Sequence, residues 1–323
     1  MMTISSLRFA GILLLCFGAN TAKAELLLGT PENLGITINS SSADAQASIS
    51  ADELALYFHS KRPGGAGNFD LYVATRASTT DVFGSPTNLD SINTEFMDRA
   101  PNISVGGLFL FFDSNRPDGV GGSDLWMASR ASPSDPFSNA VNPGGINTPF
   151  EDLAPSLSVD GLTLFFGSNR PGGQGEFDLW MTARSTQSDP FGTPVNLGSD
   201  VNTTEDDTAP SISADGLTLL YGSKRPGGNG ERDLWQVTRP TVDAPFGNPV
   251  NLSINTPFVE SAPETSLDGS TLYFTSNRPG GSGEIDLWRA RVVPEPSAML
   301  LGMLGALVAF SCVGRRPRVT NNR

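Results

Sequence analysis

One stretch of sequence occurs five times in this chain, and that repetition limits most strongly how the chain can fold. The copies begin at Ala47, Ala100, Ala154, Ala209 and Ala262. Each contains the pattern Ser-x-Arg-Pro-x-Gly, and its arginine recurs at steps of 54, 54, 55 and 53 residues: Arg62, Arg116, Arg170, Arg225 and Arg278. A single unit of this size cannot bury its apolar face alone, so the units must pack on one another. The repeat therefore predicts one closed domain.

Each copy reads as short strands joined by turns. In the third copy, the turn Asp160-Gly161 leads into the apolar run Leu162–Phe166, a glycine-rich loop follows Arg170, and residues 178–184 alternate between apolar and polar. These patterns are typical of strands and hairpin loops. The segment Pro194–Leu197 supplies a fourth, outer strand. Four-stranded units repeated around an axis form a β-propeller, so the chain is expected to be all-β with five blades, over residues 25–293.

The segment of the outer strand is displaced relative to the rest of the repeat. It precedes the first copy, at residues 29–39, and none follows the last copy. Its asparagine recurs at Asn33, Asn88, Asn142, Asn196 and Asn251. A propeller must join its first and last blades or leave an open sheet edge. We therefore expect the first segment to complete the last blade. The alternative is an open β-solenoid, whose coils of about 20–30 residues are shorter than this repeat.

The repeat resembles the TolB-like, WD-type propeller repeat. The matching residues of the third copy are Ser158, Asp160, Gly161, Leu164, Phe166, Ser168, Arg170, Gly172, Asp178, Leu179 and Trp180. The resemblance covers all five copies and implies a propeller fold. The chain departs from TolB itself, which is expected to have six blades and an additional N-terminal domain, and its glycine-rich loop is longer.

The N-terminal residues 1–24 look like a secretory signal peptide. Arg8 precedes the apolar run Phe9–Ala19, which is too short to span a membrane, and Ala22-Lys23-Ala24 has the small-x-small form of a cleavage site. The mature chain is then expected to begin at Glu25. The alternative is a retained N-terminal anchor.

The C-terminal residues 294–318 resemble a PEP-CTERM sorting signal, followed by a tail at 319–323. An apolar run at 298–314 separates the two parts of the motif: Val293, Pro294, Glu295, Pro296 and Ser297 before it, Arg315 and Arg316 after it. The run is long enough for a transmembrane helix, and the arginines would remain cytoplasmic. The resemblance implies a Gram-negative exporter, processing by an exosortase, and release or attachment at the cell surface. A plain C-terminal anchor is the alternative.

Composition excludes several classes of function. The formal net charge is −13, which repels nucleic acid and anionic lipid, so we expect no nucleic-acid partner. Cys16 and Cys312 both lie in the apolar end segments, which leaves no disulfide or thiolate metal site in the propeller. His59 is the chain's one histidine, and this argues against a Ser-His-Asp triad or a multi-histidine zinc site.

Two charged positions recur in every copy and are expected to be structural. The arginines given above are accompanied by Asp70, Asp124, Asp178, Asp233 and Asp286, on the other side of the glycine-rich loop. A salt bridge within the blade, or an aspartate accepting hydrogen bonds from loop amides, would hold that loop closed. A ring of ligands is the alternative.

The loop 172–178 is similar to a calcium-binding haemolysin-type repeat, although its spacing differs by one residue. We expect no cofactor, with calcium as the alternative.

A recurring aromatic position is expected to pack blade on blade, with a sugar-stacking platform as the alternative. It is occupied by Tyr72, Trp126, Trp180, Trp235 and Trp288.

Function more often depends on positions that differ between blades. The innermost strand contributes Ser48, Asn102, Ser156, Ser211 and Glu264, and the end of the second strand contributes His59, Asp113, Gly167, Gly222 and Thr275. His59, Asp113, Asn102 and Glu264 are the candidate binding residues. If His59 and Asp113 are not at a binding face, we expect them to be exposed loop-edge positions.

Two functions remain open from sequence. The first is a non-catalytic binding or scaffold protein of the cell surface, with a polysaccharide or an envelope protein as partner. The second is a carbohydrate-active enzyme of the five-bladed type. Such enzymes need two or three carboxylates near the axis, and the sequence offers Glu264 with Asp113 as a doubtful second. This scarcity favours binding, with no catalytic residue.

Overall fold

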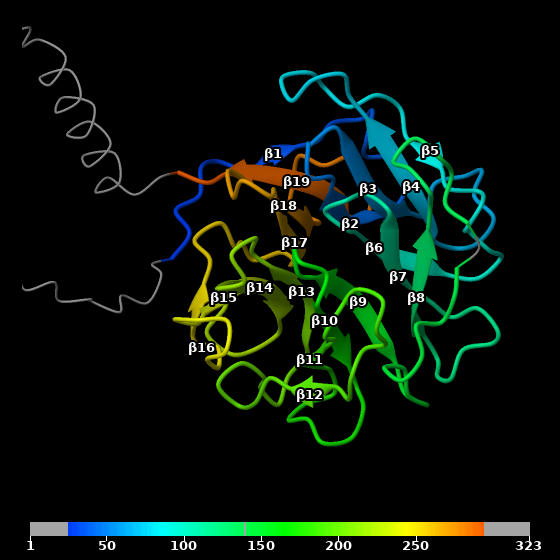
Figure 1. Cartoon of the computed structure of the whole chain (residues 1–323). Coiled ribbons are helices and arrows are strands. Elements are labelled where there is room, and N and C mark those ends of the chain that lie inside the picture. Colours follow the sequence, from blue (N-terminus) through cyan, green and yellow to red (C-terminus); the bar gives the residue numbers. More distant parts are fainter. Residues whose placement is uncertain (1–24, 139, 294–323) are drawn as a thin grey trace, which may run out of the picture.

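Five antiparallel sheets surround a central axis in the computed structural model, which describes residues 25–138 and 140–293 (Figure 1). The expected five-bladed all-β propeller is therefore confirmed. The expected signal peptide, the C-terminal helix and the sorting motif beyond Val293 lie outside the described residues. In the described part of the chain, no helix is long and apolar enough to cross a membrane.

Each blade is a meander that runs from the axis outward. The strands of the five blades, in this order, are β2 (Asp44–Ile49), β3 (Ala55–Ser60), β4 (Asp70–Thr75) and β5 (Thr87–Asn88); β6 (Asp98–Ile103), β7 (Phe109–Ser114) and β8 (Asp124–Ser129); β9 (Asp152–Leu157), β10 (Thr163–Ser168), β11 (Asp178–Ala183) and β12 (Val195–Asn196); β13 (Asp207–Ile212), β14 (Thr218–Ser223), β15 (Asp233–Thr238) and β16 (Gly247–Asn251); β17 (Glu260–Thr265), β18 (Thr271–Ser276), β19 (Asp286–Arg291) and β1 (Glu32–Asn33).

Blade 2 departs from the expected four strands. Its outer strand is reduced to one bridge between Met127 and Val141. After Val141 and Asn142 come Pro143, which has no N–H to donate, and Gly144 and Gly145, both with positive φ. This backbone cannot continue the ladder, so pairing ends after one residue.

The N-terminal strand closes the ring, as the displaced segment predicts. Strand β1 pairs with β19, with Asn33 opposite Trp288, and a further bridge joins Leu28 to Val292. The Asn33 amide also donates to Asp286 at 3.0 Å. All five blades and this closure lie within residues 25–293, so we expect that segment to fold on its own.

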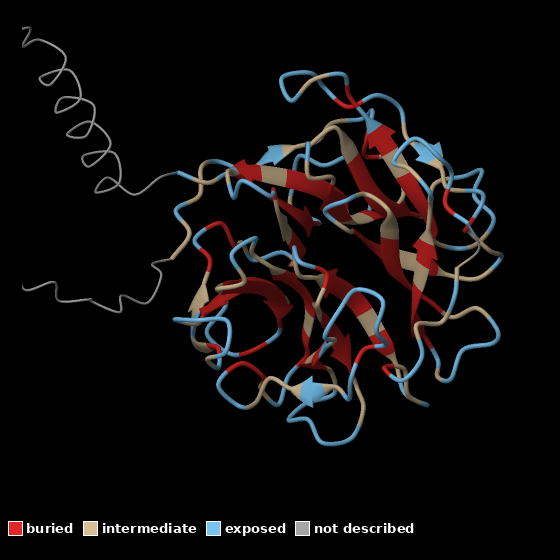
Figure 2. Cartoon of the chain, in the orientation of Figure 1, coloured by how far each residue is buried: buried red, intermediate tan, exposed pale blue. Residues whose placement is uncertain are grey.

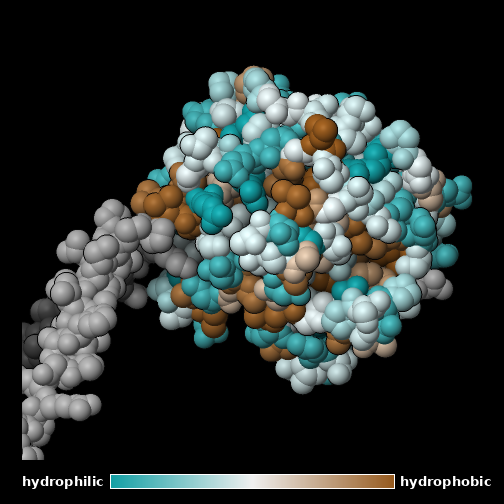
Figure 3. All heavy atoms as spheres, turned by 90° about the horizontal axis from the view of Figure 1, so that it is seen from above, coloured by the Kyte–Doolittle hydropathy of each residue, from teal (hydrophilic) through white to brown (hydrophobic). Residues whose placement is uncertain are grey.

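The core lies between blades. In one cluster, Tyr57 and Leu71 of blade 1 pack with Leu110, Phe112 and Trp126 of blade 2. Figure 2 shows the strands largely buried and the connecting loops exposed, and Figure 3 shows apolar atoms at the surface in separate patches among polar ones. The recurring Trp/Tyr position is buried in all five blades, which agrees with packing and removes it as an exposed stacking platform.

Every innermost strand contains a bulge at its third residue. These residues have φ between 50° and 56°, in the left-handed region: Gln46, Ala100, Ala154, Ala209 and Ala262. The register against the second strand shifts at this point in all five blades. A bulge redirects the backbone locally, and here it turns the N–H of several third residues toward the preceding blade.

Candidate functional site

A ring of polar side chains lies where the five innermost strands meet at the axis. It consists of the fifth residue of each strand: Ser48, Asn102, Ser156, Ser211 and Glu264. Three of them accept a hydrogen bond from a backbone N–H of the next blade, at 2.9–3.1 Å: Ser48 from Ile103, Asn102 from Leu157, and Ser156 from Ile212. The ring thus joins neighbouring blades. It also lines a small cavity of about 50 Å³ at the mouth of the central channel, beside Asn102, Ser156 and Glu264.

Glu264 is the charged member of this ring. Its carboxylate accepts hydrogen bonds from the hydroxyls of Ser211 at 2.9 Å and Ser48 at 3.4 Å, which connects blades 4 and 1 across blade 5. Burial raises its pKa to about 7, against the smaller opposing effect of the two serines. Near neutral pH this carboxyl is therefore partly protonated, and shifted pKa values of this kind are common at functional sites.

His59 and Asp113 are buried, so the expectation of exposed loop-edge positions is wrong. The Nδ1 atom of His59 accepts from the Ala100 N–H at 3.1 Å, and Asp113 accepts from the Ala154 N–H at 3.1 Å. Thr275 accepts from the Gln46 N–H in the same way, at 2.9 Å. Each of these bonds links the end of a second strand to the bulge of the next blade. Burial and the nearby cations lower the pKa of His59 to about 3, so this imidazole is neutral.

The remaining two blades have glycine at this position. Gly167 and Gly222 provide no side-chain acceptor, and Gly222 lies against Ser261 of the neighbouring blade. This position is thus a contact between blades in every case, with a different side chain in each. The residue at this position varies in the sequence, and in the structure each residue type makes a different contact with the next blade.

Asp113 and Glu264 do not come together. Asp113 lies opposite Arg99, the second residue of its innermost strand, whereas Glu264 is the fifth residue of its own strand. The two carboxyls are therefore at different levels along the axis. Asp113 is also fully engaged, because one oxygen accepts from Ala154 and the other pairs with Arg99 at 3.0 Å.

The repeated arginines pair with a carboxylate that the sequence analysis missed. Their partners are the first residues of the innermost strands: Asp44, Asp98, Asp152, Asp207 and Glu260. The salt bridge within the blade thus exists, but not with the aspartate that follows the glycine-rich loop. A repeat of Asp or Glu at the same period was the available signal. These carboxylates are fully buried, and the same residues also accept from a preceding loop, as Asp152 does from the Thr148 N–H at 2.7 Å.

The aspartate after the loop binds loop amides instead. Asp178 accepts from Gln174 and Gly175, and from the Asn196 amide at 3.2 Å. A Cβ on Gly175 would collide with the backbone of residues 203–205 in the next blade, so this glycine allows close contact between blades. Within residues 25–138 and 140–293, no group of three or more His, Cys, Asp or Glu lies close enough to hold a metal ion.

Grooves between blades open on the face that carries the Asp-Gly turns. The groove between blades 3 and 4 has a volume of about 810 Å³, and the equivalent groove between blades 1 and 2 consists of two parts of about 510 and 450 Å³. An arginine follows the third strand in blades 1 to 4, and its guanidinium lies over a phenylalanine ring at 4.3–4.4 Å: Arg76 on Phe83, Arg130 on Phe137, Arg184 on Phe191, and Arg239 on Phe246. Sequence analysis did not single out these arginines or grooves.

The chain matches no protein-family model and no curated protein. Its fold is shared with solved structures at low sequence identity. An endo-arabinase from Bacteroides thetaiotaomicron is 16% identical with a TM-score of 0.53, and the match covers 80% of this chain and 98% of that one. A putative TolB from Agrobacterium tumefaciens is 15% identical with a TM-score of 0.50, covering 81% and 89%. For TolB from Acinetobacter baumannii, at 12% identity and a TM-score of 0.46, this chain spans 53% of that protein. The first two similarities support the propeller fold, and function has to be argued from the site.

Proposed function

We propose that this protein is an exported, non-catalytic propeller that binds a cell-surface polysaccharide, or an envelope protein in its place. The observation that carries the proposal is the composition of the axial ring. Among its five residues in the described domain, Glu264 is the one carboxyl, and two serines hold it. Glycoside hydrolysis needs a pair of carboxyls about 5–10 Å apart on either side of the scissile bond. The second candidate from the sequence, Asp113, is bound to Arg99 and to the Ala154 N–H at another level along the axis.

A carbohydrate-active enzyme is the second candidate, and a specific observation favours it. The pKa of Glu264 is raised to about 7, which suits a general acid. The fold is also shared with the arabinase named above. The proposal prefers binding because a lone acid without a base or nucleophile cannot complete either hydrolytic mechanism.

The two ends of the chain supply the cellular part of the proposal. The N-terminal segment would direct export, and an exosortase would process the C-terminal motif after Val293, with transient anchoring in the inner membrane. The described domain begins and ends on one side: Leu28 pairs with Val292, and the Val293 N–H donates to Leu27 at 2.7 Å. Both ends of the described domain therefore lie in one place, at the left in Figure 1, so cleavage beyond Val293 would not cut into the blades.

The test mixes purified residues 25–293 with the exopolysaccharide of the source organism. Co-sedimentation and new reducing ends are measured in the same sample. We expect retention of the protein without new reducing ends. New reducing ends would overturn the proposal in favour of an enzyme, and the variants Glu264→Gln and Asp113→Asn would then be assayed first. No retention would exclude this polysaccharide and leave the envelope protein as the partner class.

A further inference from the structure

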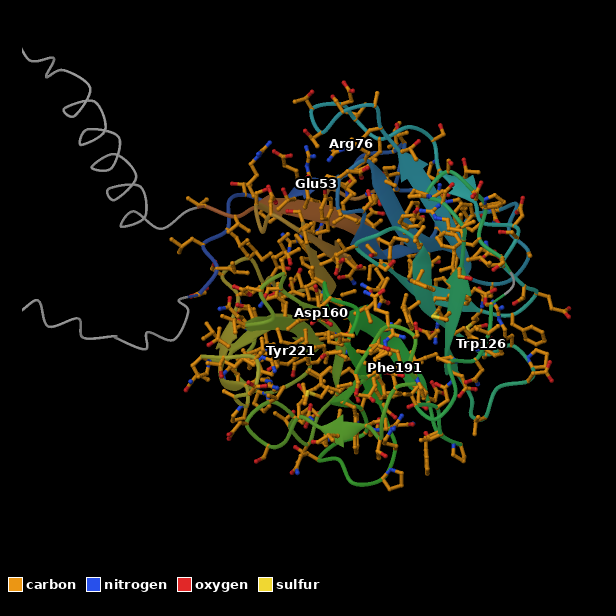
Figure 4. The ribbon with its side chains drawn as sticks, viewed as in Figure 1. Glu53, Arg76, Trp126, Asp160, Phe191 and Tyr221 are labelled. Carbon is orange, nitrogen blue, oxygen red and sulfur yellow. The ribbon has the colours of Figure 1, made fainter. Side chains whose placement is uncertain are left out.

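The groove between blades 3 and 4 is built from the same positions as the groove between blades 1 and 2 but forms one continuous cavity. Its floor contains Phe165, Met181 and Ile212, and Val159 and Val242 are exposed along it at 41% and 56%. The turns that carry Asp160 (labelled in Figure 4) and Asp215 border it on the two blades. At about 810 Å³ the groove falls within the range of about 300–1,000 Å³ typical of small-molecule sites.

One substitution distinguishes this groove from the groove between blades 1 and 2, where Tyr57 and Arg130 line both parts. There, the Tyr57 hydroxyl accepts a hydrogen bond from Arg130 at 3.1 Å and occupies the space between the blades. Phe165 takes the place of Tyr57 in blade 3, and Arg239 takes the place of Arg130 in blade 4. Phe165 has no hydroxyl, so the hydrogen bond that crosses the first groove cannot form in the second.

Arg239 is consequently held by one end only. Its Nε donates to the Gly216 carbonyl at 2.7 Å, and its guanidinium lies over Phe246 at 4.3 Å. Arg184, on the opposite wall, donates from Nε to the Gly161 carbonyl at 2.8 Å. Among the described residues, the terminal nitrogens of these two arginines have no hydrogen-bond partner. Each therefore offers oriented donors to a ligand in the groove.

The groove also carries acceptors and apolar surface. Three aspartates and the two arginines line the groove: Asp160, Asp215, Asp243, Arg184 and Arg239. Charges of both signs are therefore present, and this mixture does not favour a strongly charged ligand of either sign. A sugar hydroxyl both donates and accepts hydrogen bonds, and the C–H face of a sugar ring can pack on valine and methionine side chains. We propose that the groove between blades 3 and 4 binds a neutral oligosaccharide; this rests on the binding role proposed above and gives it a site and a ligand class.

The test measures binding of neutral hexasaccharides built from glucose, mannose, galactose, xylose or arabinose, by titration calorimetry on residues 25–293. Hexagalacturonate is the charged comparison. Val242→Arg places a large side chain in the groove, and Val120→Arg changes an equally exposed valine, 54% accessible, in the glycine-rich loop of blade 2. We expect at least one neutral hexasaccharide to bind, Val242→Arg to weaken it at least tenfold, and Val120→Arg to leave it unchanged.

A second variant tests the mechanism without adding bulk at the surface. Phe165→Tyr restores the hydroxyl that Tyr57 provides in blade 1, so it should engage Arg239 and weaken the hexasaccharide at least tenfold while the melting temperature stays the same or rises. The control Tyr57→Phe makes the reverse change at the same position of blade 1, outside this groove, and should leave the affinity unchanged.

The outcomes separate this proposal from the broader one. If the exopolysaccharide is retained equally by the wild type, Val242→Arg and Phe165→Tyr, the groove is wrong and the binding role stands. Binding of hexagalacturonate alone would overturn the ligand class. If the wild type retains neither the exopolysaccharide nor any hexasaccharide, both proposals fail for polysaccharides.

Discussion

The hairpin side of each blade and the axis follow opposite rules of variation. Beside the glycine-rich hairpins, the same acid–arginine pair is present in all five blades, with Glu260 in place of aspartate in the last. At the axis, the equivalent positions hold serine, asparagine or glutamate, yet most of them also bond to the next blade. Repetition therefore marks what every blade needs in order to fold. At the variable positions a residue can be exchanged while the contact with the next blade is kept. A specific function can develop at these positions.

The largest expected effect comes from breaking a repeated pair. Asp152→Ala leaves Arg170 without its carboxylate in a buried setting, and removing one partner of such a pair costs about 3–5 kcal/mol. Denaturant unfolding of residues 25–293 measures the free energy of unfolding. Blade 5 provides the matched control, because it uses glutamate at this position: Asp152→Glu should recover most of the loss. Equal losses in both variants would show that shape rather than charge matters at this site.

The next effect concerns the variable ring and has a defined pH dependence. The pKa of Glu264 is raised in the folded state to about 7 from 4.5, so the folded state retains the proton in that interval. The stabilisation that comes from this raised pKa is present in full below about pH 4.5. It declines as the pH rises toward 7 and is lost above that pH.

The variant Glu264→Gln removes this dependence. Between pH 5 and pH 8 the wild type should lose about 1–3 kcal/mol more of its unfolding free energy than the variant does, from the raised pKa. Melting temperatures of both proteins over this pH range measure the difference. Parallel curves for the two proteins would show that the carboxyl titrates normally, and the functional argument for Glu264 as an acid would then weaken.

His59 should show the opposite sign at a similar or smaller size. Its pKa is lowered to about 3 from 6.5, so the contribution of this residue is present above about pH 6.5 and declines as pH falls toward 3. Thr275 occupies the same position in blade 5 and also accepts from the next blade. We therefore expect His59→Thr to fold well. Between pH 7 and pH 5, the free energy of unfolding of this variant should fall by about 2 kcal/mol less than that of the wild type. A larger acid loss in the variant than in the wild type would contradict a buried neutral imidazole.

The fold was predictable because it follows from local patterns repeated five times, including the displaced outer strand. The partner of the arginine was not predictable in this way. In blade 1, Asp44 and Asp70 both lie opposite Ser60, one on each side of β3, and Ser60 is two residues before Arg62. Both carboxylates are thus within the reach of one side chain, and both accept hydrogen bonds from loop amides, so the pattern of residues does not choose between them. The burial of His59 depends on the bulge in the next blade, which alternation of residue types does not reveal.

The smallest expected effect tests whether ring closure depends on one repeated side chain. Asn33 donates to Asp286 at 3.0 Å and accepts from the Gly35 N–H at 2.8 Å, and Asn196 makes the same two contacts inside blade 3. Removing such a set of bonds costs about 1–2 kcal/mol, so Asn33→Ala and Asn196→Ala should be similarly destabilised. Urea unfolding compares them. In blade 3 the outer strand is continuous with its own repeat, whereas β1 reaches blade 5 from the other end of the described domain. If Asn33→Ala also broadens the unfolding transition while Asn196→Ala does not, β1 separates from blade 5 before the blades unfold. The outer strands of blades 5 and 3 then differ in stability, although their asparagines make the same contacts.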